Sequence, residues 1–193
     1  MTRILKTDRA KAENKNENHL HANEARWFAV YTGYKREKRV VSLLNKKGIC
    51  AYVPLQKLTR YYTSKVKKVA IPLISCYVFV KIVQSEYVTV LETQFVQRFL
   101  KINQNLLAIP QKEIDLLRRI VGEQVEIEVD TAFWKQGDKV EVIAGQLTGL
   151  QGTLVEKRGE HKLIVTLNTL GYDLMMEIKP ELLRKLPPNS VLV

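Results

Sequence analysis

A run of mostly apolar residues at positions 71–82 limits what this chain can fold into more than any other stretch. It is rich in β-branched and aromatic side chains, has Lys81 as its only formal charge, and is too short to cross a bilayer. The run predicts a buried strand that begins near Pro72, where a missing N–H is tolerated. Its side chains alternate between two faces, one of which carries Tyr77 and Phe79. These aromatic side chains need a cover, which either a helix of the same domain or a bound partner could supply.

The positive charge of the chain is concentrated in one segment. Residues 26–102 hold fifteen basic and three acidic side chains, a net charge of +12, whereas the whole chain of 193 residues carries +11. A strongly basic segment beside nearly neutral ones indicates a domain that faces a polyanion, followed by a domain that does not. An apolar fraction of 46% is enough for folded cores in one or two domains.

Several classes of protein are disfavoured by what the sequence lacks. The two cysteines, Cys50 and Cys76, lie in apolar runs and predict free thiols in a reducing compartment. The sequence has no apolar leader and no run long enough to span a bilayer, so we expect a cytoplasmic protein without membrane contact. It also lacks a metal-ligand cluster, a nucleophile–base signature and a phosphate-binding glycine-rich loop, so we expect no metal, no cofactor and no enzymatic activity.

The sequence predicts an α/β domain at residues 26–122, preceded by a polar, flexible tail at residues 1–25. The helix expected last in this domain presents Ile114, Leu117 and Val121 on one face. The predicted elements are a strand at 26–32, a helix at 34–47 stopped by Gly48, a strand at 49–55, a hairpin at 57–70, the strand at 71–82, a helix at 85–93 with Ser85 as N-cap, a strand at 96–102 and a helix at 111–121.

Four cations crowd the start of the helix expected at residues 34–47: Lys35, Arg36, Lys38 and Arg39. The macrodipole disfavours cations there, because a helix N-terminus is itself positive. Such a helix either binds an external phosphate backbone or presents a solvated basic face. The hairpin expected at residues 57–70 leaves the same choice open. Tyrosines beside lysines suit nucleic acid, but lysines on an edge strand also prevent unwanted pairing.

Glycine turns separate short alternating strands in the last third of the chain, which predicts a small β-barrel at residues 134–186. A linker is expected before it at 123–133, and part of this linker could form an added strand. Residues 187–193 are expected to form a tail. The most specific pattern covers residues 140–155, where Gly145 suits a turn, and Gly149 and Gly152 mark a positive φ or a close backbone approach. The expected strands lie at 138–143, 153–157, 163–167 and 174–178.

This glycine pattern resembles the KOW motif, and the order of elements around it resembles the NusG family of transcription elongation factors. The resemblance spans residues 26–186: a tryptophan-led first strand, a basic helix, an apolar central strand and a C-terminal KOW barrel. It implies an α+β chain. An N-terminal NusG-type α/β domain, with an antiparallel sheet flanked by helices, would precede a small SH3-like barrel of five strands.

In this family, the N-terminal domain grips the clamp helices of the RNA polymerase β′ subunit through an aromatic cavity. It bridges toward the β subunit, which favours the elongating conformer. By matched position, the resemblance implies that Tyr31, Tyr77 and Phe79 bind polymerase. It also implies that the four cations named above contact upstream or non-template DNA, and that the protein acts as a monomer.

The resemblance also assigns a partner to the barrel. The loop with Thr169, Leu170 and Gly171 matches a segment that binds ribosomal protein S10 or Rho in housekeeping members, although Leu170 stands where those members have an aromatic residue. A second departure precedes Tyr77. Family members often have Pro-Gly or Pro-Asn there, whereas this chain has a serine followed by Cys76.

The divergent sequence, the basic N-terminal domain and the extra tail resemble specialised paralogues of the UpxY/RfaH type. Those paralogues act as antiterminators on long operons such as those for capsular polysaccharide. The leading hypothesis is therefore a non-enzymatic factor that binds polymerase and suppresses pausing or termination. The alternatives are a general NusG that acts with Rho or the ribosome, and a KOW-type RNA-binding or ribosome-associated protein. A steep salt dependence of RNA binding would distinguish the latter.

Overall fold

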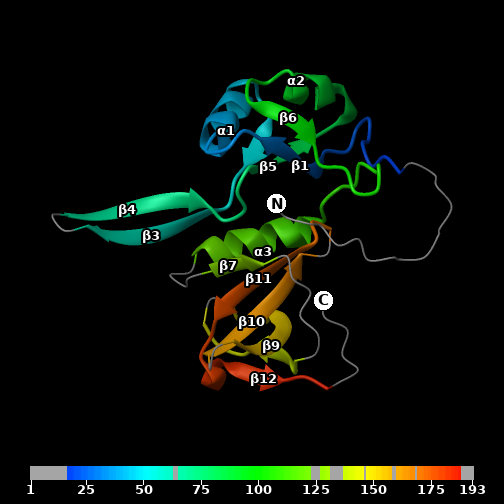
Figure 1. The fold of residues 1–193 in the computed structure, drawn as a ribbon. Helices are drawn as coiled ribbons and strands as arrows, with labels where there is room; N and C mark the ends of the chain where they lie inside the picture. The colour runs from blue at the N-terminus through cyan, green and yellow to red at the C-terminus, as the bar shows by residue number, and fades with distance from the viewer. Residues whose placement is uncertain are drawn as a thin grey trace.

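The structure is a computed structural model that describes residues 17–62, 65–122, 127–130, 137–145, 147–157, 160–167 and 169–187. Within these residues the chain forms a four-stranded sheet, a two-stranded ribbon and a six-stranded C-terminal sheet (Figure 1). No helix in this part of the chain is long and apolar enough to cross a membrane.

The four-stranded sheet is the centre of the N-terminal domain. Its order is β2-β5-β1-β6, with every neighbouring pair antiparallel. One face packs on helices α1 and α2 and buries Phe28, Val30, Val78 and Val80. The elements are β1 (Arg26–Thr32), α1 (Glu37–Lys46), β2 (Cys50–Tyr52), β5 (Tyr77–Ile82), α2 (Tyr87–Leu91) and β6 (Val96–Phe99).

The opposite face of this sheet is covered by helix α3 (Gln111–Gly122), which lies between the four-stranded sheet and the C-terminal sheet (Figure 1). Three apolar side chains of α3 are fully buried: Ile114, Leu117 and Ile120. The predicted helix at 111–121 is confirmed. So is the predicted alternation of the central strand, whose odd-numbered and even-numbered side chains enter two different cores.

The prediction of one continuous strand over residues 71–82 is wrong. Pro72 is the last residue of β4, residues 73–76 form a turn, and β5 begins at Tyr77. Cys76 has a φ of 66°, in the left-handed region, so the extended chain cannot run through it. The run therefore contains the end of one strand and the whole of another. The predicted hairpin is confirmed as β3 (Leu55–Tyr62) paired with β4 (Lys65–Pro72).

Helix α1 begins later than predicted, at Glu37. Lys35 has a φ of 58° and Arg36 is the N-cap, so neither lies within the helix. Glu37 supplies the anion that the macrodipole favours in the first turn. Its buried carboxylate accepts a hydrogen bond of 2.7 Å from the backbone N–H of Cys76. The unfavourable interaction between the cations and the helix macrodipole is therefore weaker than the sequence predicts.

Three other elements also end differently from their prediction. The strand expected at 49–55 is shortened to β2, and the strand expected at 96–102 ends at Phe99 as β6. The helix expected at 85–93 is a 3₁₀ turn η1 (Gln84–Glu86) followed by α2. Ser85 does not cap it, because the Glu86 carboxylate instead accepts the N–H of Val83 at 2.9 Å.

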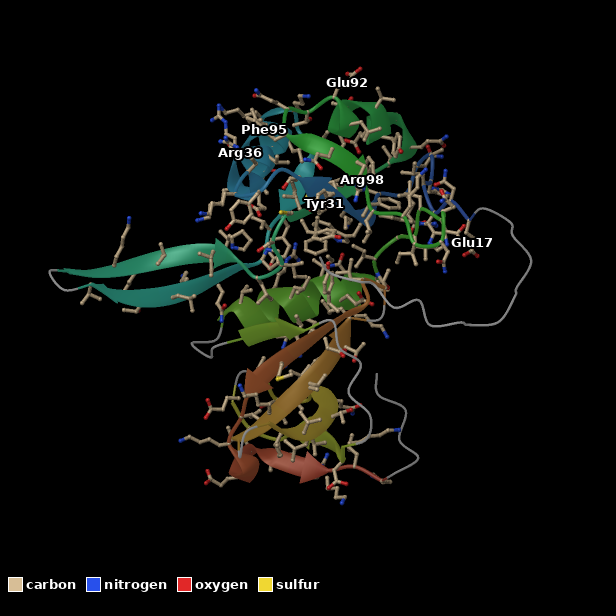
Figure 2. All side chains as sticks on the ribbon, in the orientation of Figure 1. Glu17, Tyr31, Arg36, Glu92, Phe95 and Arg98 are labelled. Atoms are coloured by element: carbon tan, nitrogen blue, oxygen red, sulfur yellow. The ribbon has the colours of Figure 1, made fainter. Side chains whose placement is uncertain are left out.

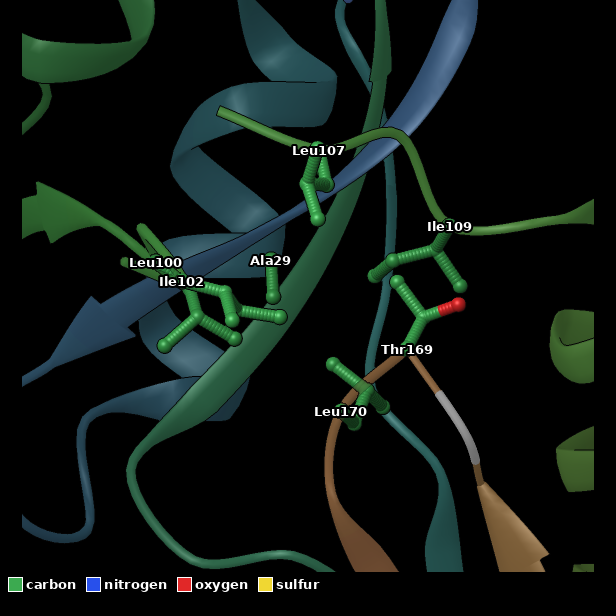
Figure 3. A pocket seen from close by; sticks show the side chains of 7 residues that line it. All are labelled: Ala29, Leu100, Ile102, Leu107, Ile109, Thr169 and Leu170. Carbon is green, nitrogen blue, oxygen red and sulfur yellow. The ribbon is translucent and has the colours of Figure 1, made fainter. Parts of the chain in front are cut away.

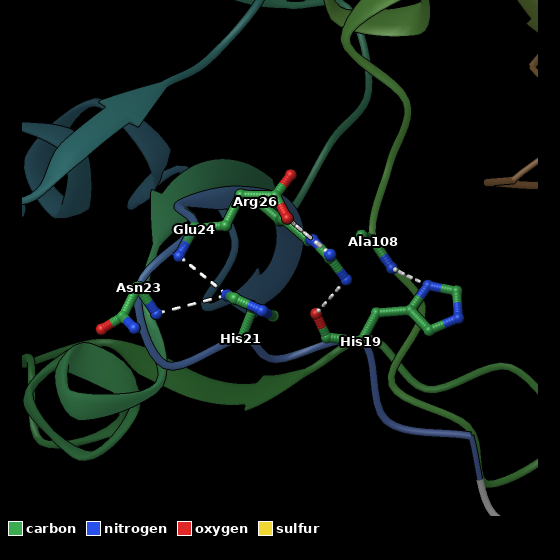
Figure 4. A network of polar contacts seen from close by, with 6 residues as sticks. All are labelled: His19, His21, Asn23, Glu24, Arg26 and Ala108. Atoms are coloured by element: carbon green, nitrogen blue, oxygen red, sulfur yellow. Dashed lines mark hydrogen bonds and ion pairs between the residues drawn. The ribbon is translucent and has the colours of Figure 1, made fainter.

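Residues 17–25 differ from the flexible tail that the sequence predicts, because polar contacts hold them against the N-terminal domain (Figure 4). The Nδ1 atom of His19 accepts a hydrogen bond of 3.1 Å from the N–H of Ala108, and Arg26 pairs with Glu24 at 2.6 Å. Leu20 packs on the apolar core. The sequence of this segment does not reveal the docking, because single polar side chains make the contacts and leave no periodic pattern. Residues 1–16 of the expected tail lie outside the described residues.

The C-terminal sheet follows the order β12-β8-β9-β10-β11-β7. The expected linker contains a strand, β7, which pairs with β11. Gly145 and Gly149 have positive φ, whereas a Cβ on Gly152 would lie 2.3 Å from the carbonyl oxygen of Ile164. A closed KOW barrel stays a prediction. The elements are β7 (Ile127–Asp130), β8 (Lys139–Val142), β9 (Gln151–Lys157), β10 (Glu160–Leu167), β11 (Tyr172–Glu177), a 3₁₀ turn (Pro180–Leu182) and β12 (Leu183–Lys185).

Candidate functional site

The structure brings the three aromatic residues expected to bind polymerase to one face of the four-stranded sheet. Tyr31 and Tyr77 are opposite each other in the register of β1 and β5, with ring centroids 5.4 Å apart and planes at 81°. Both side chains are half-buried, whereas Phe79 is fully buried. Phe79 therefore supports this surface from beneath, and the two tyrosines form its accessible part.

Two further aromatic residues belong to the same face and were missed in the sequence. Trp27 lies two positions before Ala29, and Tyr52 is opposite Phe79 in the register of β2 and β5. Strand alternation places Trp27 on the side of Tyr31, so this signal was available in the sequence. We call these five residues the aromatic face: Trp27, Tyr31, Tyr52, Tyr77 and Phe79.

Helix α3 holds the aromatic face with polar and cationic contacts as well as apolar ones. The Arg118 guanidinium lies 5.6 Å from the ring centroid of Trp27 and 5.3 Å from that of Tyr52. Trp27 donates a hydrogen bond of 2.8 Å from Nε1 to Gln111 Oε1. The Arg118 cation over two aromatic rings therefore adds to the apolar packing of α3 on this face.

Burial changes the acidity of the tyrosines around this face. It raises the pKa of Tyr52 to about 12, and the Tyr52 hydroxyl has no hydrogen-bond partner among the described residues. Burial also raises the pKa of Tyr172, aided by a hydrogen bond with Tyr77. The neighbouring Cys76 thiol raises the pKa of Tyr31. All these hydroxyls are therefore neutral near pH 7.

The C-terminal domain covers Tyr77, which α3 leaves partly open, and also contacts α3. Tyr172 packs against Tyr77 with centroids 6.0 Å apart and planes at 75°. The Glu113 carboxylate of α3 accepts hydrogen bonds from Thr169, 3.1 Å from its backbone N and 2.8 Å from its Oγ1. Arg119 of the same helix donates to the carbonyl of Thr148 at 2.8 Å. This chain itself therefore supplies the cover that the sequence left open.

The loop expected to bind the barrel's partner is the one that makes these contacts. Thr169 and Leu170 reach the N-terminal domain, and Gly171 turns the chain with a φ of 69°. Figure 3 shows the small cavity that they close with residues of the N-terminal domain. Its other lining residues are Ala29, Leu100, Ile102, Leu107 and Ile109. The two candidate binding surfaces therefore pack against each other.

The four cations expected to contact DNA are all exposed, but they have different surroundings. Arg36 lies over the ring of Phe95 at 5.0 Å, and Lys35 lies 5.0 Å from that of Tyr34. Lys38 donates to the carbonyl of Ala70 at the base of the β3–β4 ribbon, whereas Arg39 is exposed on α1.

A fifth cation, Arg98, lies 4.9 Å from the ring centroid of Tyr31 and was missed in the sequence. Figure 2 shows Arg36 beside Phe95, and Arg98 beside Tyr31. No group of three or more His, Cys, Asp or Glu side chains in the described part of the chain could hold a metal ion.

Residues 25–118 match the family model described as "Transcription termination factor nusG". This part of the chain is therefore similar to NusG domains. A structure described as "Domain interaction in Thermotoga maritima NusG" matches with a TM-score of 0.54 and 20% identity, covering 85% of this chain and 98% of that one.

Two conformations of an MjSpt4:Spt5 complex also match, with TM-scores of 0.30 and 0.32 and identities of 17% and 16%. The alignments cover 83% and 86% of this chain, and 97% and 99% of those chains. At the identity of the Thermotoga maritima match, the likeness concerns the fold alone. It extends beyond residues 25–118 into the C-terminal sheet, because 85% of this chain is aligned.

Proposed function

We propose that this protein is a transcription elongation factor whose NusG domain binds RNA polymerase through the aromatic face and suppresses pausing or termination. The observation that carries the proposal is the pair Tyr31 and Tyr77, half-exposed and in contact on a sheet face of a family-matched domain. An apolar surface of this kind suits the clamp helices of the β′ subunit, with the rest of the domain reaching toward the β subunit. Binding that prefers the elongating conformer lowers the population of paused polymerase.

The cover over the aromatic face must leave before polymerase helices can reach Tyr77, because Tyr172 packs on its ring. The polar contacts of that cover are few: two hydrogen bonds from Thr169 to Glu113 and one from Arg119 to Thr148. Each contributes about 1 kcal/mol net. The cover also shares an apolar core with the N-terminal domain, so polymerase binding must supply the free energy of this apolar contact as well as that of the hydrogen bonds.

The exposed cations at the start of α1 contact upstream or non-template DNA in this proposal. Lys35, Arg36 and Arg39 are exposed and available for phosphate, whereas Lys38 is already engaged with the β3–β4 ribbon. Once the cover leaves, the freed loop with Leu170 meets the second partner, ribosomal protein S10 or Rho. The basic domain and the divergent sequence favour a specialised antiterminator on particular operons over a general factor.

A polymerase-binding assay with the full chain tests the aromatic face. The double variant Tyr31→Ala with Tyr77→Ala should lose most of its retention on immobilised RNA polymerase. Tyr34→Ala, which removes a tyrosine that is 69% exposed, serves as a matched control and should bind as the unchanged protein does. Phe79 is left intact, because truncating a fully buried phenylalanine costs about 3–5 kcal/mol and could unfold the domain. Full retention by the folded double variant would refute the proposal.

A further inference from the structure

The β3–β4 ribbon is a strongly charged element that the polymerase contact leaves without a role. It is a two-stranded sheet of its own, and it projects away from the rest of the N-terminal domain (Figure 1). Two-stranded ribbons are only marginally stable in water, so a free ribbon of this length needs a reason. We propose that the ribbon is an arm that binds duplex DNA by lying in its major groove. This inference does not depend on the polymerase contact.

The charge of the ribbon is of one sign. Residues 55–72 contain four lysines, one arginine and no acidic residue. The side chains of Lys57, Lys67 and Lys68 are exposed. Val66, near the outer end of β4, is 60% exposed. A surface of this sign attracts a polyanion and repels other basic surfaces of the protein.

The strand register places cations on both faces of the ribbon. Lys67 is directly opposite Arg60, whereas Lys68 is opposite Thr59 on the other face, beside the position of Lys57. A phosphate backbone on each side of the ribbon would give the cations of both faces a partner.

The ribbon is long enough and suitably attached to reach a duplex beside the domain. Eight residue pairs connect β3 and β4, which corresponds to roughly 25 Å at about 3.3 Å per residue. Lys38 of α1 donates to the carbonyl of Ala70, and the N–H of Leu73 donates to the carbonyl of Pro54 at 2.8 Å. These contacts fix the base of the ribbon beside the exposed cations of α1. One duplex could therefore contact both elements.

Duplex DNA fits these observations better than duplex RNA does. The major groove of B-form DNA, about 12 Å wide, admits a two-stranded ribbon and has a phosphate backbone on each side, which matches cations on both faces. The major groove of A-form RNA is deep and too narrow for side chains to read. Single strands are bound chiefly by stacked aromatic rings. The register places Tyr61 and Tyr62 at the outer end of β3, so the assay below also includes single-stranded DNA.

Fluorescence anisotropy of the full chain with a labelled duplex DNA of about 20 base pairs tests the arm. The double variant Lys67→Ala with Lys68→Ala should weaken binding at least fivefold at moderate salt. It should also reduce the slope of log K against log salt by about 2, since each phosphate contact contributes about 0.9. The matched control, Lys46→Ala with Lys101→Ala, removes two exposed lysines elsewhere in the same domain and should change affinity less than twofold.

Three results would overturn the proposal. Unchanged affinity of the ribbon variant would mean a solvated ribbon, and an equal loss in the control variant would mean that only net charge matters. Tighter binding of single-stranded DNA or duplex RNA of equal length would exclude the major groove of DNA. Because the assay contains no polymerase, its failure leaves the polymerase proposal untouched, and the reverse also holds.

Discussion

The backbone of Cys76 connects three elements of the N-terminal domain. Its N–H donates to the buried Glu37 carboxylate at 2.7 Å, and its carbonyl accepts the N–H of Thr32 at 2.8 Å, so it ties α1 and β1 to the start of β5. It does so with a φ of 66°, which glycine or asparagine adopts more easily. The turn before Tyr77 therefore has the geometry that a glycine favours, although this chain places a cysteine there.

Replacing Cys76 with glycine should relieve this strain. We expect Cys76→Gly to unfold with a free energy about 1 kcal/mol higher than that of Cys76→Ala, because a Cβ in the left-handed region costs about 1–2 kcal/mol and glycine loses part of this gain through its own entropy. Both variants lack the thiol, so alanine is the matched control. Urea unfolding followed by circular dichroism measures the difference. An alanine variant as stable as the glycine variant would contradict it.

Tyr52 makes the stability depend on pH in the alkaline range. Its pKa is about 12 in the folded protein and about 10 in an unfolded chain, so the unfolded state loses its proton first. Its contribution is fully present below pH 10 and is lost as the pH rises toward 12.

Tyr52→Phe should therefore flatten the fall in stability between pH 10 and 12, leaving the part due to Tyr172, whose pKa is also raised. At pH 7 the same variant should be more stable by about 1 kcal/mol, because it removes a buried hydroxyl without a hydrogen-bond partner in the described structure. Urea unfolding at several pH values measures both effects. Tyr34→Phe, at an exposed tyrosine, is the control and should change neither. An unchanged alkaline profile would show that Tyr52 is more solvated than the structure indicates.

At the scale of elements, alternation and glycine positions could be read from the sequence, but turn geometry could not. The first strand begins and ends as predicted, because Arg26–Thr32 combines strand-forming side chains with Gly33 as a stop. The break at Cys76 was missed, since cysteine gives no turn signal and the apolar run continues across it. The start of α1 was missed for the same kind of reason, because Lys35 adopts a left-handed φ.

The glycines of the C-terminal sheet serve different purposes, and their substitutions should differ accordingly. A Cβ at Gly152 would lie 2.3 Å from the carbonyl oxygen of Ile164 on the neighbouring strand, whereas one at Gly149 would meet nothing within 4 Å. Gly149→Ala should cost about 1 kcal/mol for its positive φ. Gly152→Ala should cost clearly more, because backbone must move. Thermal unfolding of both variants gives the comparison, and equal losses would refute the close approach.

At the scale of the whole molecule, the packing of the two domains on each other could not be predicted from the sequence. Glu113 and Thr169 are far apart in the chain, and neither lies in a pattern that marks an interface. The aromatic face was identified as needing a cover, but only the structure shows that α3 and the loop before Tyr172 provide it. Long-range contacts of this kind depend on shape complementarity, which periodicity does not encode.

Removing the Glu113 carboxylate should open the molecule. Glu113→Ala deletes the acceptor of both Thr169 hydrogen bonds, so we expect a larger radius of gyration in small-angle X-ray scattering and several-fold tighter binding to RNA polymerase. Asp115→Ala, which removes a half-exposed carboxylate of the same helix, is the matched control and should keep the closed form. A scattering profile identical to that of the unchanged protein would show that apolar packing alone holds the domains together.

The loop that carries Thr169 and Leu170 packs against the N-terminal domain and is half-buried there, so one contact partly covers both proposed binding surfaces. Two ligands that each require the same opening become thermodynamically linked, and each raises the affinity of the other by the same factor. If the closed contact is worth about 2.7 kcal/mol, that factor approaches 100. The protein would then act as a coincidence detector, responding weakly to either ligand alone and strongly when both are present.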